Sequence, residues 1–164
     1  MSDLSHVNRA GEASMADVSA KPATARMARA EGCIRMSTGA LRAIRDNSLA
    51  KGDVLAVARI AGIQAAKRTA DLIPLCHPLP LTDVQVRFVL DDGLPGVRCE
   101  AEARTVAATG VEMEAITAVA VALVTIYDMA KSIDKGMRID GVRLLEKSGG
   151  KSGTWRAPGG EPTP

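Results

Sequence analysis

Residues 84–103 read VQVRFVLDDGLPGVRCEAEA, and this stretch decides the fold class of the 164-residue chain. Apolar residues alternate with polar ones over 84–90 and again over 97–103, which is the period of a strand with one buried face. The DDGLP segment at 91–95 between them has the composition of a turn. We therefore expect a β-hairpin at the centre of the sequence.

Helices are expected on the N-terminal side of this hairpin, after a first strand. Alternation over residues 27–36 predicts that strand. Ser37 or the next residue can cap a short helix that reaches Ile44, and Asp53 can cap a longer, alanine-rich helix over 54–70. The loop that follows contains three prolines, which stiffen it.

A long helix and a last strand are expected after the hairpin. Thr109 and Glu112 match the S/T-x-x-E capping box before an apolar run that reaches about Ile133. Alternation over 139–145 predicts the last strand. Merging the two early helices gives the order β-α-β-β-α-β. The chain is therefore predicted to be an α+β protein with a ferredoxin-like split βαβ, an antiparallel sheet with helices on one face.

Composition divides the chain into three parts and limits its function. Residues 1–22 are polar and aperiodic and predict an arm, 23–153 predict a single domain, and the Pro/Gly-rich residues 154–164 predict a disordered tail. A net charge of +2 and an aromatic content of 2% argue against a nucleic-acid-binding module. The apolar run 115–127 is too short to span a bilayer and predicts a buried helix.

The three cysteines do not form a C-x-x-C pair, which argues against a zinc site or a disulfide framework. A reducing compartment fits this pattern. The N-terminal residues lack the basic and apolar regions of a signal peptide. We expect a cytoplasmic protein with no membrane partner and no resident metal or cofactor.

Asp128 and Lys131 stand three positions apart, on one face of the predicted helix. Such a pair is usually a surface salt bridge. Here Asp128 is the first charge after 13 uncharged residues, which places it at the edge of a buried region. At such an edge, a carboxylate and an ammonium can tune each other as acid and base. The spacing leaves both interpretations open.

Two further segments carry groups for acid-base chemistry. In the proline-rich loop, His77 is a general acid or base, or a structural histidine beside a small buried Cys76. At the start of the long helix, Glu112 is explained by the capping box alone. Glu114 lies in the first turn of a very apolar helix, and a purely structural role fits it less well.

Basic residues gather in two places. The KSGGKSG segment at 147–153 combines glycines with Lys147 and Lys151, which suits phosphate oxygens but lacks the Walker A spacing. Lys51, Arg59 and Lys67 lie on or beside the predicted helix after Asp53. A flexible tail and a solvated helix face are the simpler interpretations. Together with His77 and the carboxylates, these groups suggest a site for a phosphorylated nucleotide.

Read as strings, several long segments resemble one known family. They are KGDV at 51–54, ARIAGIQAAK at 58–67, LIPLCHP at 72–78, TGVEMEA at 109–115, YDM at 127–129, KGM at 135–137, VRLL at 142–145 and KSGGKSG at 147–153. In this order, and from about Met15 to Gly153, the chain resembles the cyclic pyranopterin monophosphate synthases, the MoaC family of molybdenum cofactor biosynthesis.

The resemblance implies a lyase that converts 3′,8-cyclo-7,8-dihydro-GTP to cyclic pyranopterin monophosphate and releases diphosphate. It also implies a ferredoxin-like catalytic domain and a homohexamer, a trimer of dimers with sites shared between subunits. The family's catalytic positions match Asp128 and Lys131. Its substrate-binding positions match Arg26, Lys51, Lys67, Cys76, His77, Glu112, Glu114 and Lys147.

The chain departs from the family pattern at two places. Family members commonly carry Cys where this chain has Ala130, and often a Gly and a basic residue where it has Ala107 and Ala108. The second difference removes a possible phosphate contact. A non-catalytic sensor of a phosphorylated nucleotide is the alternative function, and the intact Asp128/Lys131 pair argues against it.

Overall fold

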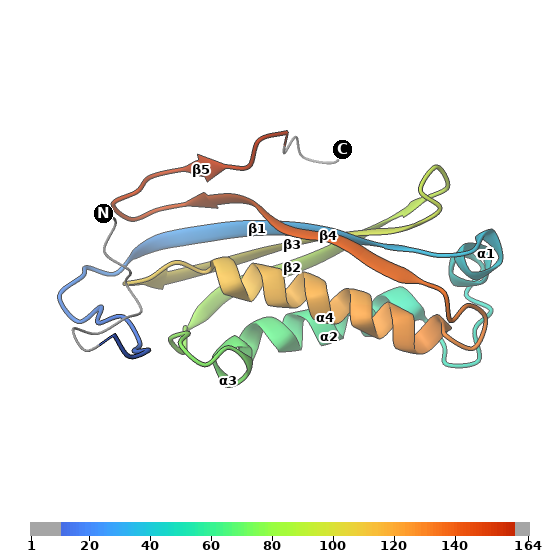
Figure 1. Ribbon diagram of the computed structural model, residues 1–164, viewed down its shortest axis with the longest axis horizontal. Helices are drawn as coiled ribbons and strands as arrows, with labels where there is room; N and C mark the ends of the chain where they lie inside the picture. Colours follow the sequence, from blue (N-terminus) through green and yellow to red (C-terminus); the bar gives the residue numbers. More distant parts are fainter. Residues whose placement is uncertain (1–10, 160–164) are drawn as a thin grey trace.

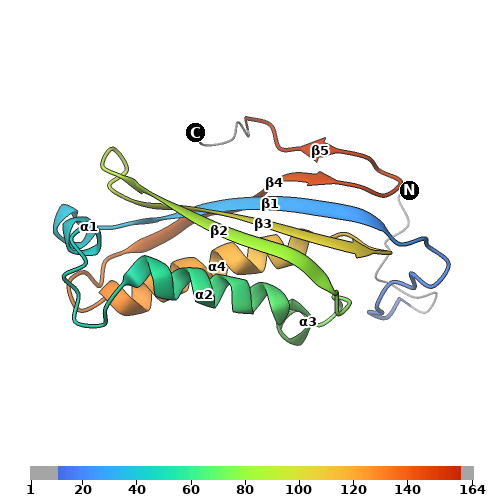
Figure 2. The same cartoon turned by 180° about the vertical axis from the view of Figure 1, so that it is seen from behind.

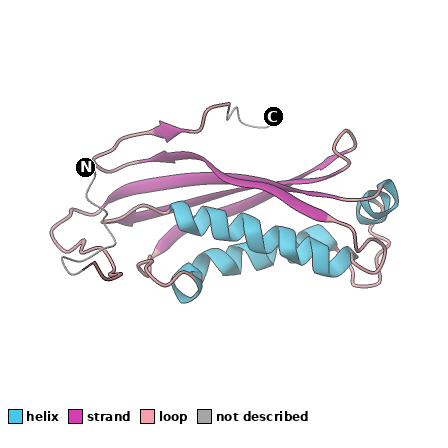
Figure 3. Cartoon of the chain, viewed as in Figure 1, coloured by secondary structure: helices cyan, strands magenta, loops and turns pink. Residues whose placement is uncertain are grey.

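The computed structural model describes residues 11–159, so the start of the predicted arm and the end of the predicted tail lie outside the described residues. One antiparallel sheet carries two long helices on one of its faces (Figure 1; Figure 3). The α+β, ferredoxin-like prediction is confirmed. The elements are β1 (Thr24–Arg35), α1 (Thr38–Arg45), α2 (Val54–Lys67), α3 (Thr69–Leu72), β2 (Leu81–Asp91), β3 (Gly96–Ala107), α4 (Glu112–Ala130), β4 (Arg138–Ser148) and β5 (Trp155–Arg156).

The strand order is β2-β3-β1-β4-β5, so the central hairpin forms one side of the sheet. In that hairpin Val86 faces Ala101 and Phe88 faces Cys99, as the alternation predicts. The turn closes because Asp91 Oδ1 accepts hydrogen bonds from the backbone of Gly93 and Leu94. Side chains alternate between the two faces of each strand. Those on the face toward the helices form the core beneath them.

Helices α2 and α4 run antiparallel, side by side (Figure 2). They pack closely because small residues, such as Gly62 and Ala122, lie between them. A Cβ atom at Gly62 of α2 would lie only 2.9 Å from the Ala118 carbonyl oxygen of α4. A Cβ atom at Gly32 of β1 would lie 2.9 Å from Leu123 of α4. This close fit fixes where the two ends of each helix lie, and both ends matter for the site.

Helix α4 begins later and ends earlier than the sequence predicts. The capping box of Thr109 and Glu112 is wrong: the N-cap is Val111, no side chain caps it, and Glu112 is the first helical residue. The Glu112 carboxylate binds Lys147 instead. The helix ends at Ala130 rather than at Ile133. The apolar run was expected to be too short to span a bilayer, but α4, with 19 residues, is long and apolar enough to cross one. It packs as a buried helix against the sheet, as predicted.

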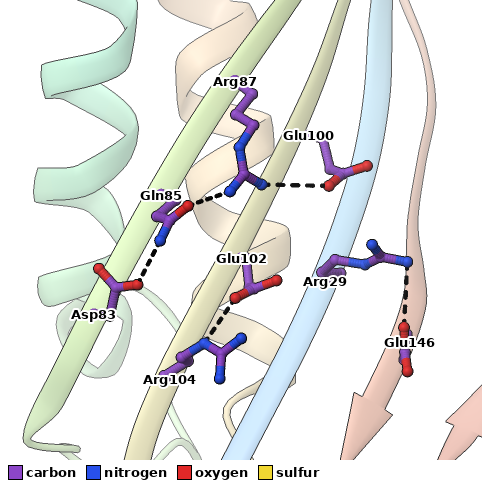
Figure 4. A network of polar contacts seen from close by, with 8 residues as sticks. All are labelled: Arg29, Asp83, Gln85, Arg87, Glu100, Glu102, Arg104 and Glu146. Carbon is purple, nitrogen blue, oxygen red and sulfur yellow. Dashed lines mark hydrogen bonds and ion pairs between the residues drawn. The ribbon is translucent and has the colours of Figure 1, made fainter. Parts of the chain in front are cut away.

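The other face of the sheet carries charged side chains in pairs (Figure 4). Arg29 on β1 pairs with Glu146 on β4 at 3.2 Å, and Arg104 pairs with Glu102 at 2.7 Å along β3. A further strand, β5, lies beyond β4. The expectation of an irregular tail from residue 154 therefore does not hold for Trp155 and its neighbour, which pair with β4.

Candidate active site

The C-terminal end of α4 carries a cluster of three charges. Asp128 Oδ1 lies 2.7 Å from Lys131 Nζ, one helical turn further on, and Asp128 Oδ2 lies 2.8 Å from Lys51 Nζ. The Lys51 ammonium also donates a hydrogen bond to the Asp128 backbone carbonyl at 2.8 Å. One carboxylate therefore holds two ammonium groups, and all three side chains are about half exposed.

Local structure places Lys51 at this cluster. Asp53 caps α2 by accepting a hydrogen bond from the Ala56 amide at 2.9 Å. Gly52, with φ at 88°, turns the chain just before that cap. Because α2 runs antiparallel to α4, the start of α2 lies beside the end of α4. Lys51 reaches Asp128 for that reason, although 77 positions separate them.

The cluster shifts the pKa values of Asp128 and Lys131 in opposite directions. Hydrogen bonds from Lys131, and then from Lys51, lower the pKa of Asp128 to about 2. The hydrogen bond from Asp128 in turn raises the pKa of Lys131. Near neutral pH the carboxyl is therefore ionised and the Lys131 side chain is protonated. A cation of this kind can donate a proton, and the carboxylate orients it.

The opposite end of α4 faces a cavity of about 370 Å³. Cys76 and His77 line it from the proline-rich loop, and Glu112 and Glu114 line it from the first turn of α4. The loop approaches the helix because α3 turns the chain back after α2 (Figure 1). The structure therefore brings together two segments that the sequence presented separately.

Glu114 is the buried acid of this cavity, with only 4% of its surface exposed. Burial, with a smaller contribution from the nearby charge of Glu112, raises the pKa of Glu114 to about 6. Burial, followed by the charge of Glu114, also raises the pKa of the Cys76 thiol. The cavity thus holds a neutral thiol and a carboxyl that titrates near physiological pH.

Two smaller cavities adjoin this one. Lys67, at the end of α2, and Glu114 line a cavity of about 290 Å³. Arg26, Glu112 and Lys147 line another of about 190 Å³, in which Lys147 Nζ lies 2.9 Å from Glu112 Oε1. Each glutamate borders two cavities. The two glutamates therefore join seven of the predicted residues into one continuous region.

The ten predicted residues thus form two groups, and the structure does not bring these groups together within one chain. Lys51, Asp128 and Lys131 lie at one end of α4, and the other seven lie at its opposite end. Glu114 and Asp128 are 14 positions apart in one helix, which corresponds to about 21 Å at 1.5 Å per residue. Among the described residues, no group of three His, Cys, Asp or Glu side chains is placed to hold a metal.

Some residues at the larger cavity were missed by the sequence reasoning. Val18 and Lys21 line it from the part of the arm that the structure describes. Thr109 lines it too, although it was predicted to serve as a helix cap. The arm has no helical or strand periodicity, so its position gave no signal. A lysine only five positions before Arg26 was the one available hint.

The chain is similar to known proteins over nearly its whole length. A family model described as the MoaC family matches residues 15–150. A protein of Methylobacterium sp. named cyclic pyranopterin monophosphate synthase is 60% identical over 157 residues, which cover 96% of this chain and 98% of the relative. A protein of Cereibacter sphaeroides with the same name is 57% identical, over 96% of this chain and 99% of the relative.

Proposed function

This chain belongs to the MoaC family, and on that premise we propose that it is a lyase that converts 3′,8-cyclo-7,8-dihydro-GTP to cyclic pyranopterin monophosphate. Diphosphate is the second product, and the reaction is an early step of molybdenum cofactor biosynthesis. The observation that carries the proposal is the near full-length similarity to proteins of that name. All ten residues that the resemblance implies are also present, in two groups.

Proton transfer in this proposal belongs to Lys131 and Asp128. The ammonium of Lys131 donates a proton during the ring rearrangement that turns the purine into the pterin. The carboxylate of Asp128 stays ionised, stabilises the ammonium and directs it toward the substrate. The second ammonium of the cluster, Lys51, faces a substrate phosphate. Lys131 is therefore the acid of the reaction and Asp128 its positioning anion.

The phosphate chemistry follows from the basic side chains. A ribose-derived hydroxyl oxygen attacks the innermost phosphorus, forms the new P–O bond of the cyclic phosphate and loses its proton to water. The bond to the bridging oxygen breaks, and its electron pair leaves on the diphosphate. Cationic side chains neutralise the charge that develops there. We assign this role to Arg26, Lys51, Lys67 and Lys147.

The remaining residues recognise the base and the sugar. His77, Glu112 and Glu114 line the largest of the three joined cavities and orient these parts of the substrate. A carboxyl with a pKa of about 6, such as Glu114, can accept or donate hydrogen bonds at neutral pH. The thiol of Cys76 contributes a small, neutral wall beside it.

We further propose that the complete site forms between subunits of a cytoplasmic homohexamer, a trimer of dimers. The support is the distance between the two clusters, about 21 Å along α4. A single substrate molecule meets both clusters if the start of α4 in one subunit lies near the end of α4 in its partner. A two-fold axis between two antiparallel α4 helices satisfies this condition and builds two equal sites.

The first experiment tests turnover. Purified protein is incubated with the cyclised dihydro-GTP intermediate, and diphosphate release is followed together with formation of the pterin product. We expect both products in equal amounts. Tight binding of the intermediate with neither product would contradict the synthase proposal and favour the sensor function.

A second experiment tests the shared site. Lys131→Ala and His77→Ala subunits, each inactive alone, are mixed under conditions that allow exchange. Random pairing makes half of the dimers mixed, and each mixed dimer has one intact site, so about a quarter of wild-type turnover returns. If all site residues came from one chain, mixing would restore nothing.

A further inference from the structure

A second large cavity adjoins the one that holds His77 and Glu114. Its volume is about 440 Å³, and its wall is formed by the arm, the start of β1, the segment before α4 and the glycine-rich loop after β4. The two cavities share Lys21, Thr109 and Gly110. The space therefore continues from the proposed base pocket, past Gly110, into this second cavity.

The wall of the second cavity is basic. Lys21, Arg26 and Lys151 line it, and none of its lining residues is acidic. Within the described chain, neither Lys21 nor Lys151 forms an ion pair with a carboxylate. Three positive charges therefore face one cavity, and the described glutamates Glu112 and Glu114 line the adjoining cavities instead. Such an arrangement favours a polyanion.

Arg26 gives this cavity its shape. Its guanidinium donates hydrogen bonds to the carbonyl oxygens of Ala108, at 3.3 Å, and Gly149, at 3.5 Å. Both segments that border the cavity are thus tied to one side chain. The ammonium groups of Lys21 and Lys151 are left to meet a ligand.

The glycines of the loop after β4 allow its backbone to lie close to the Arg26 side chain. Gly149 and Gly150 have φ values of 99° and 72°, a region that favours glycine. A Cβ atom at Gly150 would collide with the guanidinium of Arg26. The backbone of the loop therefore lies directly against Arg26, and a larger residue at position 150 would push that side chain away.

We propose that Lys21 and Lys151 bind the diphosphate end of the substrate. This inference rests on the proposed function and adds two residues to the binding site. The base and sugar lie beside His77 and Glu114, and the phosphate chain passes Gly110 into the second cavity. When the bond to the innermost phosphorus breaks, its electron pair moves onto the diphosphate. The two ammonium groups stabilise that added charge.

The test uses inorganic pyrophosphate as the probe. Its affinity for the full-length protein is measured by calorimetry at low salt, and its inhibition of turnover is measured in parallel. We expect Lys21→Ala and Lys151→Ala each to weaken pyrophosphate binding about tenfold, since each removes one charge-assisted contact. Arg42→Ala removes the same charge from exposed α1, at the far end of the molecule, and should change neither measurement (Figure 1).

Two further variants test the shape and charge of the cavity. Gly150→Ala, which displaces Arg26, should weaken pyrophosphate binding although it removes no charge. Ala108→Lys adds an ammonium at the cavity wall and should strengthen binding. If Lys21→Ala and Lys151→Ala both bind pyrophosphate as Arg42→Ala does, the inference is wrong, and turnover by the wild-type protein would leave the proposed function intact. If the wild-type protein has no turnover, the proposed function fails, and the assignment of this cavity to a leaving group fails with it.

Discussion

Two carboxylates on one helix, Glu114 and Asp128, have pKa values displaced in opposite directions. Glu114 is 4% exposed, and burial raises its pKa to about 6. The Asp128 side chain is 55% exposed, and two lysines lower its pKa to about 2. The surroundings, rather than the side-chain type, set whether each acid holds a proton.

The difference assigns different chemistry to the two ends of α4. A carboxyl that titrates near neutral pH exchanges protons and hydrogen bonds with a bound base. A carboxylate held between two ammonium groups keeps its charge and stabilises the protonated form of Lys131. Acid-base pairs in enzymes are commonly separated in this way. The following variants test whether the two ends differ as the structure indicates.

The largest effect is expected at the exposed end. Lys131→Ala removes the proposed proton donor and should lower kcat by about a thousandfold, within the usual range for general acid-base catalysis. Lys131→Arg should lower kcat comparably, because arginine keeps the ion pair but does not release its proton. Pterin formation measures the effect, and circular dichroism checks the fold. Turnover near the wild-type rate in either variant would remove Lys131 from the proton-transfer role.

Asp128→Asn should reduce kcat by about a hundredfold and also shift the pH profile. Asp128 raises the pKa of Lys131, so its removal lowers that pKa. The protonated form of Lys131 is then lost at a lower pH than in wild type, so the alkaline limb of the kcat profile moves to lower pH. Profiles of wild type and variant measured side by side check this. An unmoved alkaline limb would mean that Asp128 does not control the protonation of Lys131.

Glu114→Gln tests the buried end through stability. The folded pKa of Glu114, about 6, is above its unfolded value of 4.5. The folded state therefore binds the Glu114 proton more tightly than the unfolded state does. The stability gained from this proton is complete below pH 4.5 and is lost as pH rises through 6. Wild type should lose about 2 kcal/mol over this window relative to the glutamine variant. Urea unfolding at pH 4 and pH 7 measures it, and parallel pH curves for the two proteins would contradict the raised pKa.

Lys67→Ala should have the smallest effect and should act on binding. Lys67 lies beside Glu114 at a cavity wall, away from the proton-transfer cluster. Its removal should raise KM about tenfold, the cost of one charged contact, and leave kcat nearly unchanged. Separate determination of kcat and KM distinguishes this result from that of Lys131→Ala. An unchanged KM would exclude Lys67 from the phosphate-binding set.

The fold could be predicted because its signals are local. The period of two over 84–103 and the caps at Ser37 and Asp53 depend on neighbouring residues, and the structure confirms them. The cap at Thr109 failed because Glu112 has a stronger partner, Lys147, 35 positions away. The strand at Trp155 was missed because two residues are too few to show a period.

The site could be predicted only in part. The Asp128–Lys131 ion pair follows from helical spacing, and the structure confirms it at 2.7 Å. The third member, Lys51, joins through helix packing, which no local pattern reveals. The raised pKa of Glu114 likewise depends on burial in the folded chain, which the local sequence does not reveal. Tertiary contacts, rather than residue types, decided these features.

The short strand β5 carries a tryptophan whose intrinsic fluorescence can report on binding. Trp155 is the only tryptophan in the chain, it is 43% exposed, and it pairs across the strands with Lys147. The glycine-rich loop that joins β4 to β5 carries Lys151 between them. Indole emission responds to the polarity and mobility of its surroundings. An anion that orders this loop therefore changes the fluorescence of the unlabelled protein, and binding can be followed without a modified substrate.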